Sequence, residues 1–231
     1  MQNKQKPEDK AYDFTSHSAV YEEEVGKSHK YYLKIKCEDM LSSLEKHGCR
    51  PQITLDLGCG TGEVEEILAG SCGKITGIDA SKGMIEKARE KKLGNCTFLQ
   101  ADVLNLLFPD ETFDCVFSSC LFHHVPPEKW SDAMSESARV TKKSGILFVF
   151  EHNPGNPVTQ RTVKNSPVDI GVTLLAPSKM VELFKQANLR IIEKRFLLFL
   201  PAFLSPLRPI EKAFGMIPLG GQYFIAGRLK N

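Results

Sequence analysis

Residues 55–62 read Leu55-Asp56-Leu57-Gly58-Cys59-Gly60-Thr61-Gly62, and this stretch decides the fold. The β-branched and apolar residues 53–55 predict a strand that leads into it. Three glycines at alternate positions predict a tight turn, because glycine tolerates positive φ and the close approach of a ligand. Val64, Ile67 and Leu68 then recur at helical spacing. The stretch therefore predicts a strand, a glycine turn and a helix whose unpaired N–H groups face a bound molecule.

An acidic residue ends the next predicted strand, residues 74–79. Asp79 stands close to the spacing at which an acid accepts hydrogen bonds from ribose hydroxyls in nucleoside-binding α/β folds. The whole pattern resembles motif I of the class I S-adenosylmethionine-dependent methyltransferases. The residues at the positions of that motif are Asp56, Gly58, Gly60 and Gly62. The resemblance covers about residues 50–150 by motif and implies S-adenosyl-L-methionine as cofactor, with S-adenosyl-L-homocysteine as product.

A dinucleotide-binding Rossmann protein is the rival interpretation of the glycine turn. Its fingerprint places a third glycine where a helix N-terminus meets a pyrophosphate. Counted from Gly58, that position is Glu63, whose carboxylate would repel a pyrophosphate. The sequence therefore favours the methyltransferase interpretation.

Composition limits the class of protein. The chain has 231 residues, is 42% hydrophobic and carries a net charge of +2, which gives no basic field that indicates nucleic acid. Its longest apolar run, residues 196–204, is far too short to span a bilayer, and no signal-peptide pattern opens the chain. Seven cysteines include no C-x-x-C pair, so we expect reduced thiols in a cytoplasmic protein.

Strands and helices alternate along most of the chain, which predicts an α/β fold with helices on both faces of a mainly parallel sheet. The predicted strands are 53–57, 74–79, 96–100, 113–119 and 145–151, and the helices between them are 62–70, 81–93 and 128–141. Residues 152–176 predict no helix or strand, and a helix over 177–188 follows. The resemblance implies a Rossmann-like sheet of seven strands, in which residues 190–200 and 222–229 form a C-terminal antiparallel hairpin.

Two parts of the chain are expected to differ in role. Residues 1–46 read as helices, and the resemblance implies that such a segment forms an N-terminal helical lid over the cofactor. Residues 47–231 form the predicted S-adenosylmethionine-binding methyltransferase domain.

The resemblance also assigns cofactor contacts residue by residue. It implies that Asp79 binds the ribose, that Met84 lies against the adenine, and that Asp102 and the N–H of Val103 meet the adenine edge. It places Ser118 and Ser119 near the methionine amine, and Asp56 either there or in the glycine turn. Each has a structural alternative: Asp79 as a helix cap, Asp102 as a turn cap and Met84 as plain core.

Four polar residues follow the fourth and fifth predicted strands, at the edge where ligands of open α/β sheets bind. His123 and His124 come after the first of these strands, and Glu151 and His152 end the second. An alcohol acceptor benefits from a general base, for which histidine is the usual choice. We expect one of these histidines to be that base, oriented by Glu151, while another is structural. No metal is expected, because no cluster of His, Cys, Asp or Glu shows ligand spacing along the sequence.

The residues that follow the fourth strand also narrow the acceptor. Amine methylation of nucleobases typically uses an Asn/Asp-Pro-Pro-aromatic tetrapeptide there, whereas this chain has Ser118-Ser119-Cys120-Leu121. We therefore expect oxygen methylation of a small or lipid-linked molecule and no nucleic-acid partner. The apolar residues within 196–217 either line a pocket for that molecule, meet a membrane surface or cover the sheet edge. Two alternatives stay open: a cofactor-binding protein without catalysis, and a methyltransferase acting on nitrogen or carbon of a metabolite.

Overall fold

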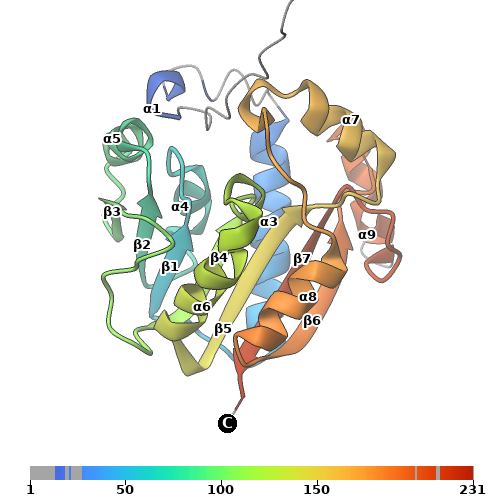
Figure 1. The fold of residues 1–231 in the computed structure, drawn as a ribbon. Helices are drawn as coiled ribbons and strands as arrows, with labels where there is room; N and C mark the ends of the chain where they lie inside the picture. Colours follow the sequence, from blue (N-terminus) through green and yellow to red (C-terminus); the bar gives the residue numbers. More distant parts are fainter. Residues whose placement is uncertain (1–13, 19–20, 22–27, 201, 212–213, 231) are drawn as a thin grey trace, which may run out of the picture.

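A single seven-stranded sheet organises the computed structural model, which describes residues 14–18, 21, 28–200, 202–211 and 214–230 (Figure 1). The strand order is β3-β2-β1-β4-β5-β7-β6. The strands are β1 (Ile53–Leu57), β2 (Lys74–Asp79), β3 (Cys96–Gln100), β4 (Phe113–Ser119), β5 (Thr141–His152), β6 (Leu189–Leu197) and β7 (Gln222–Leu229). Strand β7 lies between β5 and β6 and runs antiparallel to both. The predicted Rossmann-like sheet with a C-terminal antiparallel hairpin is confirmed.

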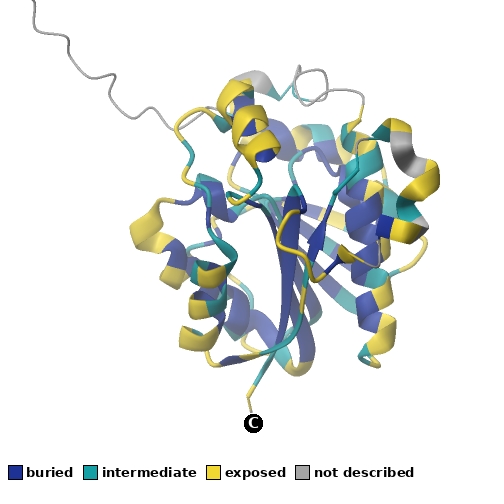
Figure 2. Ribbon diagram, turned by 90° about the vertical axis from the view of Figure 1, so that its right-hand side faces the viewer, coloured by how far each residue is buried: buried dark blue, intermediate teal, exposed yellow. Residues whose placement is uncertain are grey.

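Helices cover both faces of this sheet (Figure 1). The described α-helices are α1 (Phe14–His17), α3 (His29–Lys46), α4 (Glu63–Leu68), α5 (Lys82–Glu90), α6 (Trp130–Val140), α7 (Pro157–Asn165), α8 (Pro177–Gln186) and α9 (Arg208–Glu211). Successive strand residues point to opposite faces, so Phe117 packs with α3 and α4 while Val116 packs with α6 and α8. Figure 2 shows the strands buried between helices whose outer turns are exposed.

The segment 152–176 differs from the prediction, because it contains α7 and a short 3₁₀ helix, Pro167–Asp169. Asn156 caps α7 by accepting hydrogen bonds from the N–H groups of Val158 and Thr159, and proline stands at the first helical position. Only Thr159 and Val163 of this helix are buried. The apolar periodicity is therefore too weak to predict a helix. The local signal for α7 is its capping residue together with the proline that follows.

Two element boundaries differ from the prediction for a clear backbone reason. Helix α4 begins after Gly62, whose φ of 77° breaks the helical backbone. Strand β5 begins at Thr141 rather than at residue 145, because Phe113 of β4 pairs with Thr141 before the register shifts.

The predicted lid lies partly outside the described residues. Helix α1 contacts the start of α5, where Thr15 Oγ1 is 3.1 Å from Ser81 Oγ, and the ring of Phe14 stands 5.1 Å from that of His124. Helix α3 instead buries its apolar face in the core. The division of the chain at residue 46 stays a prediction.

The apolar segment 196–217 is divided between core and surface. Phe196 and Leu197 are buried in β6, as expected for a strand that covers the sheet. The exposed members of the segment are Phe203, Leu207, Ile210, Phe214, Met216 and Ile217. Within the described residues, no helix combines the length and the apolar character needed to cross a bilayer.

Candidate functional site

The glycine turn leaves one of its three glycines facing open space. Gly58, Gly60 and Gly62 all have positive φ, at 77°, 53° and 77°. A Cβ added to Gly58 would stand 2.9 Å from Leu121, and one added to Gly62 would stand 3.0 Å from Phe98. A Cβ on Gly60 would meet nothing within 4 Å. Gly60 is therefore where the backbone can approach a ligand, whereas its two neighbours are required by internal packing.

Asp79 ties this turn to the end of β2. Its carboxylate accepts hydrogen bonds from the N–H groups of Gly60 at 3.0 Å and Ser81 at 2.8 Å. Burial raises the pKa of Asp79, and those two backbone bonds partly offset the effect. The side-chain cap of α5 is Ser81, which accepts from the N–H of Met84, so Asp79 is free of that capping role. Its contact with a ribose stays a prediction.

The other predicted cofactor residues take different environments. Met84 is almost fully buried, as a core residue would be. Asp102 is exposed and accepts from the N–H of Leu104, which is the turn-capping alternative. Val103 is buried in the core. Ser118 is fully buried, with no hydrogen-bond partner for its hydroxyl in the described part of the chain. None of these environments tests the cofactor contacts, which stay predictions.

Two buried carboxyl groups lie behind the glycine turn. Asp56 in β1 and Glu65 in α4 are both essentially inaccessible to solvent. Across the described residues, Asp56 Oδ1 and both Glu65 carboxyl oxygens lack a hydrogen-bond donor. Burial raises the pKa of Asp56 well above its ordinary value, and the neighbouring Glu65 raises it further. Burial also raises the pKa of Glu65 to about 7, so the pair retains a proton near neutral pH.

This pair makes the stability of the fold depend on pH. The pKa of Glu65 rises from 4.5 to about 7 on folding, so the folded state binds the extra proton between these values and loses stability as pH rises through them. We expect Glu65→Gln to be more stable than the wild type at pH 8, by about 1–3 kcal/mol, with a smaller difference at pH 5. Urea denaturation at both pH values measures this. Equal differences at the two pH values would contradict it, and Glu86→Gln, at an exposed position of α5, is the matched control.

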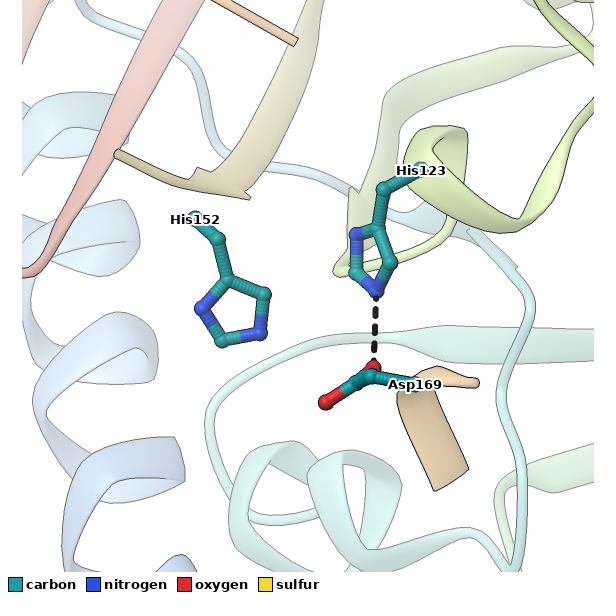
Figure 3. Close-up of side chains that lie close together, drawn as sticks. All are labelled: His123, His152 and Asp169. Atoms are coloured by element: carbon teal, nitrogen blue, oxygen red, sulfur yellow. Dashed lines mark ion pairs between the residues drawn. The ribbon is translucent and has the colours of Figure 1, made fainter. Parts of the chain in front are cut away.

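His123 is held between two carboxylates. Its Nδ1 is 2.6 Å from Glu151 Oε2, and its Nε2 is 3.3 Å from Asp169 Oδ1 (Figure 3). The other oxygen of Glu151 accepts from the N–H of Phe122 at 2.7 Å. Burial alone would lower the pKa of His123, but Glu151 and Asp169 outweigh it and raise the pKa to about 10. As it stands, His123 is an imidazolium that donates through both nitrogens and has no lone pair for a proton.

His124 has the opposite electrostatics. Its Nε2 is 3.6 Å from the same oxygen of Asp169. Burial, and after it the adjacent His123, lower the pKa of His124 to about 4. His124 is therefore a neutral imidazole at physiological pH, able to accept a proton.

His152 lies between these groups and β7. Its Nδ1 is 3.3 Å from Gln222 Nε2, and its ring centre is 5.1 Å from that of His123. Figure 3 shows the second ring nitrogen of His152 turned toward Asp169. The Oε1 of Gln222 is buried without a partner in the described part of the chain. Together with Asp169, the predicted residues His123, His124, Glu151 and His152 thus form one group, which we call the histidine cluster.

Four residues of this region were missed from the sequence: Lys36, Cys120, Asp169 and Gln222. Lys36 in α3 donates to Ser119 Oγ at 3.0 Å and to Cys120 Sγ at 3.2 Å. Burial raises the pKa of Cys120, but Lys36 and His152 outweigh it and lower the pKa to about 6. Cys120 also takes a φ of 63°, which is uncommon outside glycine. These residues come from distant segments, and the one local signal is that Lys36 stands among the buried apolar residues of α3.

Comparison with known proteins adds a family-level finding. A family model described as "Methyltransferase domain" matches residues 55–149. The chain is 36% identical over 110 residues to the ubiquinone/menaquinone biosynthesis C-methyltransferase UbiE of Escherichia coli K12. That match covers 44% of this chain and 43% of the relative, so it spans less than half the length of each.

Solved structures extend the likeness to nearly the whole chain at the level of the fold. A putative methyltransferase in complex with the Trm112 methyltransferase activator of Haloferax volcanii has a TM-score of 0.70 at 21% identity, covering 95% of this chain and 98% of that one. A SAM-dependent methyltransferase from Archaeoglobus fulgidus has a TM-score of 0.69 at 20% identity, covering 94% and 99%.

Proposed function

We propose that this chain is a class I S-adenosyl-L-methionine-dependent methyltransferase, which the family match, the curated relative and the shared fold support. We further propose that it transfers a methyl group to a hydroxyl oxygen of a small or lipid-linked apolar molecule. The observation that carries the proposal is the position of the histidine cluster. It includes the residues just after β4 and the last two residues of β5, at the same sheet edge as the glycine turn, where ligands of open α/β sheets bind.

The residues around the glycine turn fit the cofactor. Gly60 offers backbone with open space beside it, and the partly buried carboxylate of Asp79 is suited to accept from two ribose hydroxyls. The bound cofactor supplies an electrophilic methyl group on a sulfonium, and S-adenosyl-L-homocysteine remains after transfer. This chain must then orient the acceptor, exclude water and receive one proton.

Two histidines could accept the proton of the acceptor hydroxyl. A new O–CH₃ bond forms while the hydroxyl O–H bond breaks, and the proton passes to a neutral imidazole of the histidine cluster. His124 and His152 are the candidates, because His123 already donates through both ring nitrogens. Glu151 then acts as a positioning residue, since it fixes His123 and the backbone of Phe122.

The apolar segment 196–217 supports an apolar acceptor. Six apolar side chains of this segment are exposed, among them Phe203 at 80% and Met216 at 78%. Exposed apolar patches mark contacts with a ligand, a partner or a membrane. We infer that this segment meets the apolar part of the acceptor or the membrane surface that carries it. Seven free cysteines support a reducing, cytoplasmic setting.

A carbon acceptor is the second candidate, favoured by the activity of the Escherichia coli relative, a C-methyltransferase. A ring hydroxyl that loses its proton can pass its charge to a neighbouring carbon. The same imidazole chemistry therefore serves both outcomes.

A labelled-methyl assay tests the proposal. We expect label from S-adenosyl-L-methionine to enter apolar phenols or lipid-linked hydroxyl compounds, and product NMR distinguishes O-methyl from C-methyl. Asp79→Ala should weaken cofactor binding by about 1.5–3 kcal/mol, the scale of a charged hydrogen-bond partner. Cofactor binding without transfer to any such acceptor would indicate a binding protein, and transfer only to nucleic acid would refute the acceptor class.

A further inference from the structure

We propose that His123, His152 and Asp169 form a binding site for one divalent transition-metal ion, of which Zn²⁺ is the type. The three side chains each offer one ligand atom, and these atoms lie within 4.8 Å of one another. They come from three separate segments: a 3₁₀ helix (Phe122–His124), the end of β5, and the 3₁₀ helix Pro167–Asp169. Figure 3 shows their polar ends turned toward a common point.

The spacing is close to what such an ion needs. Zinc bonds to histidine nitrogen and carboxylate oxygen at about 2.0–2.2 Å, so two ligands of a tetrahedral site lie roughly 3.3 Å apart. His123 Nε2 and Asp169 Oδ1 already stand at 3.3 Å. The ligand atom of His152 lies within 4.8 Å of both, so His152 must move closer to them to bind the same ion. Two imidazoles with one carboxylate suit zinc, iron or cobalt better than magnesium or calcium, which prefer oxygen ligands.

A second set of residues stands behind the ligands. Metal-bound histidines usually hydrogen-bond a carboxylate or carbonyl through the other ring nitrogen, which fixes the tautomer. Glu151 takes this place behind His123 at 2.6 Å. Behind His152, the amide of Gln222 lies 3.3 Å from Nδ1, and its Oε1 is buried without a partner in the described part of the chain. Turning that amide over lets Oε1 accept the Nδ1 proton, which leaves the other nitrogen of His152 free to bind the ion.

The charge around the cluster also favours a cation. Glu151 and Asp169 place two carboxylates within 3.3 Å of the two ring nitrogens of His123, and an ion that binds His123 Nε2 displaces any proton held there. Lys36 donates to Ser119 and Cys120 rather than to the carboxylates of the cluster. His124 is not one of the three ligands.

A role for the ion rests on the proposed function. A bound Lewis acid lowers the pKa of a coordinated hydroxyl, so it would help the acceptor lose its proton to His124. This inference replaces the expectation, drawn from sequence spacing alone, that the site needs no metal.

Metal titration without cofactor or acceptor tests the site, so failure of methyl transfer cannot be confused with failure of metal binding. Chelator-treated protein is titrated with Zn²⁺ by calorimetry and with Co²⁺ by visible absorption. We expect one ion per chain and a Co²⁺ spectrum of nitrogen and oxygen ligands. His152→Ala and Asp169→Asn should each weaken binding at least 100-fold, and Gln222→Ala by about tenfold or more.

His47→Ala is the matched control. His47 lies where α3 ends, before β1 begins, and contacts Glu193 rather than the cluster. It should leave stoichiometry and affinity unchanged. No one-to-one binding by the wild type, or equal loss in His47→Ala and His152→Ala, would overturn the proposal. Circular dichroism separates loss of binding from loss of fold, and Asp169→Asn keeps the size of the side chain it replaces.

Discussion

Gly60→Val is expected to reduce affinity for S-adenosyl-L-methionine at least 100-fold while most of the fold persists. The new side chain would meet no protein atom within 4 Å at its Cβ, so it would enter the space in which we place the cofactor. A β-branched residue also resists the φ of 53°, and a shifted backbone would misplace the N–H that bonds Asp79. Isothermal titration measures the loss, and NAD should bind neither protein.

Gly48→Val separates this effect from backbone strain. Gly48 has a φ of 65°, and a Cβ there also meets nothing within 4 Å, but it lies after α3 and away from the glycine turn. Both variants should lose about 1–2 kcal/mol of stability from the left-handed backbone. Gly48→Val should retain full cofactor affinity. Full cofactor occupancy in Gly60→Val would show that the glycine turn is not the site.

Glu151→Ala is expected to cost about 3–5 kcal/mol of folding stability, because it removes one of the two carboxylates that pair with buried His123 and leaves the N–H of Phe122 without its acceptor. Glu151 is fully buried and bonds both His123 Nδ1 and the N–H of Phe122. Glu151→Gln should cost less, since an amide oxygen can still accept from Phe122. Chemical denaturation measures both variants.

The control for this change is Glu86→Ala. Glu86 pairs with Lys82 on the exposed face of α5, where an ion pair contributes at most about 1 kcal/mol. The two alanine variants should therefore differ by several kcal/mol. A loss below about 1 kcal/mol for Glu151→Ala would mean that the pair of His123 and Glu151 does not stabilise the fold.

Much of the fold could be predicted because local patterns and packing agree. Strands β1, β2, β3 and β4 match their predicted bounds, since each is a short apolar or β-branched run between turn residues. Helix α7 was missed because its start depends on the Asn156 cap, while only two of its residues are buried. Periodicity detects buried faces, and a surface helix leaves little of that signal.

From the sequence, only those site residues that lie at the ends of strands could be predicted. The carboxyl ends of β4 and β5 carry His123, Glu151 and His152. The rule that ligands bind at the carboxyl ends of strands therefore predicted that these residues lie together. Asp169 and Gln222 reach the same point from segments with no motif of their own. The protonation of His123 also escaped the sequence, because it depends on two carboxylates that meet only in the folded chain.

The antiparallel strand β7 has a consequence for how the protein is made. It is the last described strand to leave the ribosome, yet it lies between β5 and β6 and pairs with both. Until β7 emerges, β5 presents an unpaired edge, and β6 has no place in the sheet. Gln222, at the start of this strand, likewise reaches His152 only then. The nascent chain can therefore assemble β1 to β5 during synthesis, but the histidine cluster gains its last neighbour only when translation has passed β7.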